Sequence, residues 1–266
     1  MTAAIVSPTQ AVPNMTPDYE VRLLLNSAAV LSPLYELTDT VLSAFEMPPT
    51  VTKINVQFLD TSSKELYTAD WSTRIRKTEN KSLFELTYKK RYAITDGDID
   101  ASLTAANSDG FTADNAKYDA QVEWGYQKQT LSISRKKTIA DQGSSGTDLP
   151  GTSNSQKMLI DQAPDKFDNW RSNKWGTSLL AASRIFGPVL FTRSIGSWNG
   201  IQLYIEVWPL MNLAGTGSEY VVEASFKTKS RTTALIEQRN LVNFLQSNGW
   251  FLAQDSLKTQ FIMERY

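Results

Sequence analysis

Charged side chains recur at alternate positions in several short stretches of the chain. Arg74 and Arg76 are separated by one residue, and Asp18, Glu20 and Arg22 follow the same spacing. Alternate side chains of an extended strand lie on one face, so each set is expected to face the same way. Guanidinium pairs suit phosphate oxygens, and paired carboxylates suit Mg²⁺, which itself bridges phosphates. The spacing therefore favours chemistry on a phosphorylated ligand.

The same alternation occurs in two later stretches, where two interpretations are open. One face of each stretch carries Gln202, Tyr204, Glu206 and Trp208, and Val221, Glu223, Ser225 and Lys227. The wet face of an antiparallel sheet that packs on one side is the commonest source of such a pattern. Paired charges at a fixed spacing favour the second interpretation, a surface that binds phosphate and metal.

The composition excludes several kinds of site. The 266 residues include no cysteine and no histidine, which excludes disulfides, thiolate or imidazole metal ligands and a Ser-His-Asp triad. Any bound metal would be a hard cation such as Mg²⁺ or Mn²⁺ with oxygen ligands. Because the formal net charge is −1, an anion site must come from a local concentration of basic residues.

Strands and a few helices are expected to position these residues. Hydrophobic periodicity predicts strands over 18–25, 52–60, 72–77, 83–90, 120–127, 130–137, 189–196, 201–210 and 220–229. It predicts a helix over 34–45 between two proline signals, a tryptophan-rich helical segment over 165–186, and a helix over 232–248 that stops at Gly249. Residues 1–17 are expected to form a flexible leader and residues 141–157 a mobile loop. Many antiparallel strands with few helices predict one α+β domain over 18–266, a barrel or a sandwich.

The expected partner is a small phosphate compound. The sequence contains no apolar run of the roughly 18 residues that a membrane span needs, so a soluble, cytoplasmic protein without a membrane partner is expected. The sequence also lacks an external basic patch that could guide RNA, which argues against a nucleic-acid partner. A monomer or a homodimer is expected.

The order of the motifs resembles that of the CYTH domains, the triphosphate tunnel metalloenzymes, over residues 18–262. The motifs are Asp18-Tyr-Glu20-Val-Arg22, Asp60-Thr61, Arg74-Ile-Arg76, Thr87-Tyr-Lys89, Glu123, Arg193, Glu206, Glu223-Ala-Ser225 and Lys258-Thr259-Gln260. Three residues depart from the family pattern: Asp18 stands where a glutamate is usual, Arg22 replaces a lysine, and Ser225 replaces a second late glutamate.

The resemblance implies a fold and a site. The fold would be an eight-stranded antiparallel β-barrel with a polar lumen, or tunnel, and helices packed on its outside. The phosphate oxygens would be bound by Arg22, Arg74, Arg76, Lys89 and Arg193. A Mg²⁺ or Mn²⁺ ion would be held by carboxylates from the set Asp18, Glu20, Glu85, Glu123, Glu206 and Glu223. Catalytic roles would belong to Glu20, Arg22 and Lys89.

Two aromatic residues leave the substrate class open. Tyr204 and Trp208 would bind substrate through an apolar section of the lumen suited to an organic group, unless Trp208 turns outward near Pro209. The predicted function is a divalent-metal-dependent phosphohydrolase that cleaves a small organic or inorganic triphosphate. One alternative is a pyrophosphate-releasing lyase or cyclase of the same scaffold. The other is a non-catalytic polyphosphate-binding module, which Ser225 favours if it weakens metal binding. Arg135 and Lys137 are assigned to neither face.

Overall fold

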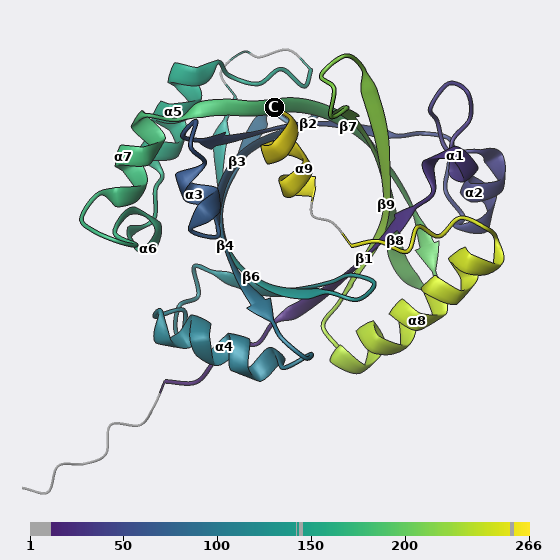
Figure 1. The fold of residues 1–266 in the computed structure, drawn as a ribbon, viewed down its shortest axis with the longest axis horizontal. Coiled ribbons are helices and arrows are strands. Elements are labelled where there is room, and N and C mark those ends of the chain that lie inside the picture. The colour runs from purple at the N-terminus through teal and green to yellow at the C-terminus, as the bar shows by residue number, and fades with distance from the viewer. Residues whose placement is uncertain (1–11, 142, 144–145, 256–257) are drawn as a thin grey trace, which may run out of the picture.

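The strands form one closed barrel. The computed structural model describes residues 12–141, 143, 146–255 and 258–266. Its strands are β1 (Asp18–Leu25), β2 (Thr52–Asp60), β3 (Trp71–Thr78), β4 (Leu83–Ile94), β5 (Asp119–Trp124), β6 (Gln129–Ala140), β7 (Arg184–Trp198), β8 (Ile201–Met211) and β9 (Ser218–Thr228). Their order around the barrel is β1-β5-β6-β4-β3-β2-β7-β8-β9, and β9 pairs with β1 to close the ring. Figure 1 shows this ring of strands.

The barrel differs in one respect from the eight antiparallel strands that the family resemblance implies. It has nine strands, and β1 pairs in parallel with β5, with Asp18 opposite Gln121. The other pairs are antiparallel. An odd number of strands cannot alternate in direction around a closed ring, so at least one pair must be parallel. The periodicity of the sequence contains all nine strands, and the number eight came from the resemblance alone.

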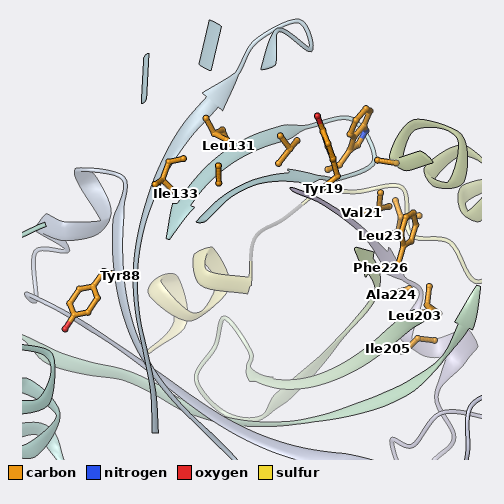
Figure 2. Close-up of a cluster of buried hydrophobic side chains, with 14 of the residues drawn as sticks. Tyr19, Val21, Leu23, Tyr88, Leu131, Ile133, Leu203, Ile205, Ala224 and Phe226 are labelled. Carbon is orange, nitrogen blue, oxygen red and sulfur yellow. The ribbon is translucent and has the colours of Figure 1, made fainter. Parts of the chain in front are cut away.

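Helices cover the outside of the barrel. They are α1 (Ser27–Val30), α2 (Asp39–Ala44), α3 (Glu65–Thr68), α4 (Ile99–Ser108), α5 (Thr152–Asp161), α6 (Asp165–Asp168), α7 (Trp175–Ala181) and α8 (Arg231–Ser247), and α9 (Lys258–Arg265) ends the chain. Figure 1 shows α4, α8 and the α5–α7 group around the ring. Figure 2 shows Val21, Leu23, Leu203, Ile205 and Phe226 on the outer face, where they belong to a large buried cluster. Among the described residues, no helix combines the length and the apolarity needed to cross a membrane.

The helix α9 lies inside the ring of strands rather than outside it (Figure 1). It contributes Ile262 and Met263 to a second buried apolar cluster, here called the α9 cluster. The members of this cluster are Leu24, Ile54, Val56, Phe58, Phe186, Val189, Phe191, Trp208, Leu210, Val221, Ile262 and Met263. One side of the barrel interior is therefore a packed core that the chain fills with its own last helix.

Two helical segments are shorter than the periodicity predicts. The predicted helix over 34–45 forms only as α2, which begins at Asp39. Before it, the hydroxyl of Ser32 accepts hydrogen bonds from the backbone N–H groups of Leu34 and Glu36, and Tyr35 has a left-handed φ of 61°. These local bonds replace a first helical turn. The segment over 165–186 divides into α6 and α7, and β7 begins at Arg184.

Parts of the predicted leader and loop make defined contacts. Residues 1–11 of the leader and residues 142, 144 and 145 of the loop lie outside the described residues. Met15 is buried, and the amide of Asn107 donates to the backbone oxygen of Val12. Within 141–157, the side chain of Gln57 donates to the backbone oxygen of Pro150, and α5 begins at Thr152. The segment predicted as a mobile loop therefore includes the start of a helix.

Candidate active site

A cavity of about 480 Å³ lies within the barrel and is lined mainly by charged side chains. Its cationic residues are Arg22, Arg74, Arg76, Lys89, Arg91, Lys136, Arg193, Lys227 and Lys258. Its acidic residues are Asp18, Glu20, Glu85, Asp119, Glu123, Glu206 and Glu223. All the residues predicted to bind phosphate or metal are thus brought together in one cavity.

Two arginines on β3 share one carboxylate on β4. The guanidinium of Arg76 lies 2.7 Å from Glu85 Oε1, and that of Arg74 lies 3.3 Å from the same atom. Burial and the neighbouring Arg76 lower the pKa of Arg74 to about 10. Burial would raise the pKa of Glu85, but Arg76 and Arg74 outweigh it and the pKa is lowered. Glu85, predicted as a metal ligand, is positioned as their counter-ion.

Glu123 on β5 occupies a similar position between two other cations. Arg22 Nη2 donates to one oxygen at 2.9 Å, and Lys89 Nζ donates to the other at 2.6 Å. Burial would raise the pKa of Glu123, but Arg22, Lys89 and Arg91 hold it well below its usual range. Burial lowers the pKa of Lys89 to about 8, against the attraction of Glu123. This carboxylate is also an internal counter-ion.

Arg91 is a cavity residue that the sequence reasoning missed. It follows Glu85, Thr87 and Lys89 at the same alternate spacing, so extending that strand by two residues would have found it. Its guanidinium contacts Ser72 and Thr259 and lies 3.7 Å from Glu123. We call Arg22, Arg74, Arg76, Lys89 and Arg91 the cationic wall.

Several donors of the cationic wall lack acceptors. In the described part of the chain, seven buried polar side-chain atoms have no hydrogen-bond partner. Four of the seven are Nε atoms of arginines, and the four residues, Arg22, Arg74, Arg76 and Arg91, all line this cavity. Unpaired buried donors are costly, so their concentration at one place points to an anionic ligand.

A second charged group forms where β7, β8 and β9 meet α9. Arg193 donates to Glu206 Oε1 through Nε at 2.9 Å, and Lys258 Nζ donates to Glu206 Oε2 at 2.5 Å and to Glu223 Oε1 at 2.7 Å. Burial would raise the pKa of Glu206, but Lys258 and Arg193 hold it at about 2. Burial raises the pKa of Glu223, although Lys258 and Arg22 act in the opposite direction. Arg193 is therefore paired with a carboxylate rather than free.

The carboxylates predicted to bind metal fit that role unequally. The described residues contain no group of three or more acidic side chains that could hold a metal ion. Asp18 is exposed, and Glu20 is 3.5 Å from Lys227, whose side chain is also largely exposed. Mg²⁺ is commonly bound by one or two carboxylates together with substrate phosphates. Asp18 and Glu20 fit this kind of binding, whereas Glu206 and Glu223 do not.

The two aromatic residues on β8 have different environments. Trp208 faces the interior rather than turning outward, and its ring stacks on Phe191 with centroids 3.7 Å apart. It is 5% exposed and donates from Nε1 to Glu206 at 3.0 Å, so it belongs to the packing beneath α9. Tyr204 is half-buried, and the Arg193 guanidinium lies 5.1 Å from its ring centroid. Tyr204 is the more accessible of the two rings.

Other motif residues have structural positions. The carboxylate of Asp60 accepts from the backbone N–H groups of Thr61, Leu66 and Tyr67, so it caps the short helix α3. Arg135 and Lys137 lie on the outside of β6, where they line a separate surface pocket, while Lys136 between them faces the lumen.

Comparisons with known proteins place the fold. No family model and no curated relative matches the chain. One solved structure is HpAC1 from Hippeastrum, provisionally described as an adenylyl cyclase with a dominant triphosphatase activity. It superposes on this chain with a TM-score of 0.52 at 16% sequence identity, and the match covers 93% of this chain and 99% of the other. A structure from Bacillus halodurans, provisionally described as an adenylate cyclase, gives a TM-score of 0.52 at 12% identity, over 94% and 98%. The chain shares the barrel fold of these proteins.

Proposed function

We propose that this protein is a phosphohydrolase that cleaves a small triphosphate inside the barrel with the help of Mg²⁺ or Mn²⁺. The observation that carries the proposal is a set of four arginines that line one cavity and whose Nε atoms have no hydrogen-bond partner. A buried donor without an acceptor costs about 1–3 kcal/mol, and more when it is charged. Anionic oxygens bound among these arginines would satisfy the donors together.

The cationic wall would bind the phosphate chain. Arg74 and Arg76 already share one carboxylate, so their remaining donors are available to phosphate oxygens. Arg22 and Lys89 are oriented by Glu123 and would contact a neighbouring phosphoryl group. Phosphoryl transfer depends on positioning and charge neutralisation more than on covalent chemistry by the protein. A wall of fixed cations can supply both.

The exposed end of the cavity would hold the metal and the attacking water. Asp18 and Glu20 would bind Mg²⁺ or Mn²⁺ jointly with phosphate oxygens, and the bound ion would neutralise charge that develops on the phosphates. Glu20 lies partly exposed on the same strand face as Arg22. Its carboxylate would accept a hydrogen bond from water and orient it towards a phosphorus atom held by the arginines.

The comparisons and the packing favour hydrolysis of a bare or nucleotide-type triphosphate. The Hippeastrum protein with the same fold is described as having a dominant triphosphatase activity. The α9 cluster occupies the apolar side of the interior and includes Trp208, so little apolar surface remains for a large organic group. An isoprenoid diphosphate is therefore a less suitable substrate than tripolyphosphate or a nucleoside triphosphate. We keep the pyrophosphate-releasing reaction as an outcome that the assay must distinguish.

The test is a substrate panel that separates the products. Tripolyphosphate, nucleoside triphosphates, thiamine triphosphate and an isoprenoid diphosphate are incubated with the full chain and Mg²⁺ or Mn²⁺. Orthophosphate, pyrophosphate and the organic product are measured separately. We expect orthophosphate from at least one triphosphate, and we expect chelation of the metal to abolish it.

The matched control uses two arginines with different positions in the barrel. Arg76→Ala removes a cation that lines the cavity, whereas Arg135→Ala removes one from the outside of β6. Arg76→Ala should abolish most of the turnover, and Arg135→Ala should leave it unchanged. Absence of any product from folded protein would refute the catalytic proposal. Pyrophosphate with a cyclised or eliminated organic product would replace hydrolysis by a lyase reaction.

A further inference from the structure

A single ammonium lies between two buried carboxylates that the family resemblance implies as metal ligands. Glu206 and Glu223 are opposite each other in the β8–β9 register and are 4% and 2% exposed. Lys258, the first residue of α9, donates to both, at 2.5 Å and 2.7 Å. Since α9 lies inside the ring of strands (Figure 1), the lysine reaches the pair from the interior of the barrel.

The donors around Glu206 leave little room for another cation. Oε1 accepts from Arg193 at 2.9 Å and 2.5 Å, and Oε2 accepts from Lys258 and from the indole of Trp208 at 3.0 Å. A divalent ion would have to displace at least one of these donors. If it entered without displacing one, it would add two positive charges to a buried group in which Lys258 and Arg193 already balance the two glutamates. Uncompensated buried charge is strongly unfavourable.

We infer that Lys258 is the built-in cation of the Glu206–Glu223 pair and excludes divalent metal from it while α9 is docked. The inference goes beyond the proposed function, because it assigns the cation that occupies these carboxylates and the element that supplies it. It confines divalent ions to the exposed end of the cavity, near Asp18 and Glu20. It also makes α9 a determinant of metal stoichiometry in addition to a packing element.

The helix α9 has anchors that do not depend on Lys258. Ile262 and Met263 are buried in the α9 cluster. At the end of the helix, the hydroxyl of Tyr266 accepts from the backbone N–H of Met211 at 2.9 Å, and Arg265 is 2.9 Å from Glu219. Replacing Lys258 by an uncharged residue of similar length should therefore leave α9 in place and the two carboxylates without their cation.

The test measures Mn²⁺ binding to the full chain without phosphate, by electron paramagnetic resonance of the free ion. Lys258→Met should add one Mn²⁺ ion per chain, with an affinity at least about tenfold above any site of the unmodified protein, because both carboxylates lose the ammonium that they share. Adding Glu223→Gln to Lys258→Met should remove the new site. Lys258→Arg, which keeps the charge, should not create it.

The control removes another buried lysine. Lys77 pairs with the single carboxylate of Asp141 on a different part of the barrel, and both side chains are almost fully buried. Lys77→Met should give no Mn²⁺ site, because Lys77 pairs with one carboxylate where Lys258 pairs with two. Circular dichroism and thermal melts identify which variants remain folded.

Two results would overturn the inference. One is a folded Lys258→Met variant that binds no additional Mn²⁺. The other is an unmodified protein whose Mn²⁺ binding falls on Glu223→Gln, since the pair would then hold metal in the presence of Lys258. The second measurement decides the question even if Lys258→Met does not fold. Because neither measurement uses a phosphate substrate, failure of this inference is distinguishable from failure of the proposed hydrolysis.

Discussion

The two sides of the barrel interior are built from the same kind of strand, but one side carries charged inward residues and the other carries mostly apolar ones. The cationic wall on β1, β3 and β4 has more donors than its two glutamates, Glu85 and Glu123, can accept. On β2, β7 and β8 the inward residues are mostly apolar and are covered by α9. An inward strand face can thus be filled by the chain or left for a ligand. The residue types at alternate positions decide which.

The largest expected effect concerns the stability of the α9 cluster. Phe186 is fully buried in this cluster. Phe186→Ala should lower the free energy of unfolding by about 3–5 kcal/mol, because it removes buried apolar area and leaves a cavity. Denaturant unfolding measures the change. Phosphate affinity per folded molecule should be unchanged, and a matching loss of affinity would show that the two sides are not separate in function.

The next effect concerns the cationic wall, where a substitution should reduce activity and leave stability unchanged. Arg74→Ala should reduce kcat/KM at least about tenfold, which corresponds to about 1.4 kcal/mol, because one charge-assisted clamp on phosphate is lost. The fold should not be weakened, since Arg76 still pairs with Glu85 and the crowding of two guanidiniums is relieved. Steady-state kinetics and thermal melts give the two readouts. A variant that melts earlier and keeps full activity would assign Arg74 to structure.

A third effect follows from the protonation of Lys89. Burial lowers its pKa to about 8, so the side chain loses its charge as the pH rises from 7 to 9. Tripolyphosphate affinity should fall over this interval. Lys89→Arg should remove the part of the fall that is caused by deprotonation of Lys89. The free energy of unfolding should instead rise with pH above pH 8, because there the unfolded chain binds more protons at this lysine than the folded chain. Equal pH profiles for the two proteins would exclude Lys89 from phosphate binding.

The contrast between the two sides also separates what the sequence predicts from what it cannot. All nine strands and α8 were predicted, because strand alternation and a capped amphipathic helix are local signals, although β7 begins five residues before its predicted start, within the segment predicted to be helical. The predicted binding residues also meet in one cavity, since strand register brings alternate positions together. The sequence was therefore informative wherever the cause was local.

The inward face of β2 could not be predicted. Ile54, Val56 and Phe58 alternate with Asn55 and Gln57, and the usual expectation places the apolar face towards the outer helices. Here Val56 and Phe58 point inward, because α9 supplies an apolar partner there. Asn55 and Gln57 donate instead to backbone oxygens of the segment before α5. The packing partner α9, at the far end of the chain, therefore determines which face of β2 points inward.

The pairing of Glu206 and Glu223 with Lys258 also could not be predicted from residue spacing. Glu206 and Lys258 are 52 residues apart and come together only because α9 enters the barrel. The family resemblance implied that Glu206 and Glu223 bind metal, and neither it nor the spacing could reveal an ammonium between them. The identity of the cation depends on the fold, and the Mn²⁺ measurements on Lys258 variants test it.

The smallest expected effect lies at the border between the two sides, at Tyr204. Its ring is half-buried beside the Arg193 guanidinium, 5.1 Å away, so it can contact a base or another aromatic group attached to a triphosphate. Cation–π and stacking contacts at such partly exposed sites contribute about 0.5–1 kcal/mol, which is roughly twofold to fivefold in affinity. Tyr204→Leu should weaken nucleoside triphosphate binding by that factor and leave tripolyphosphate unaffected, as measured by competition titration. Trp208 is withheld from the ligand by its stacking on Phe191, so an effect of Trp208→Ala that is specific to the organic substrate would contradict the division between the two sides.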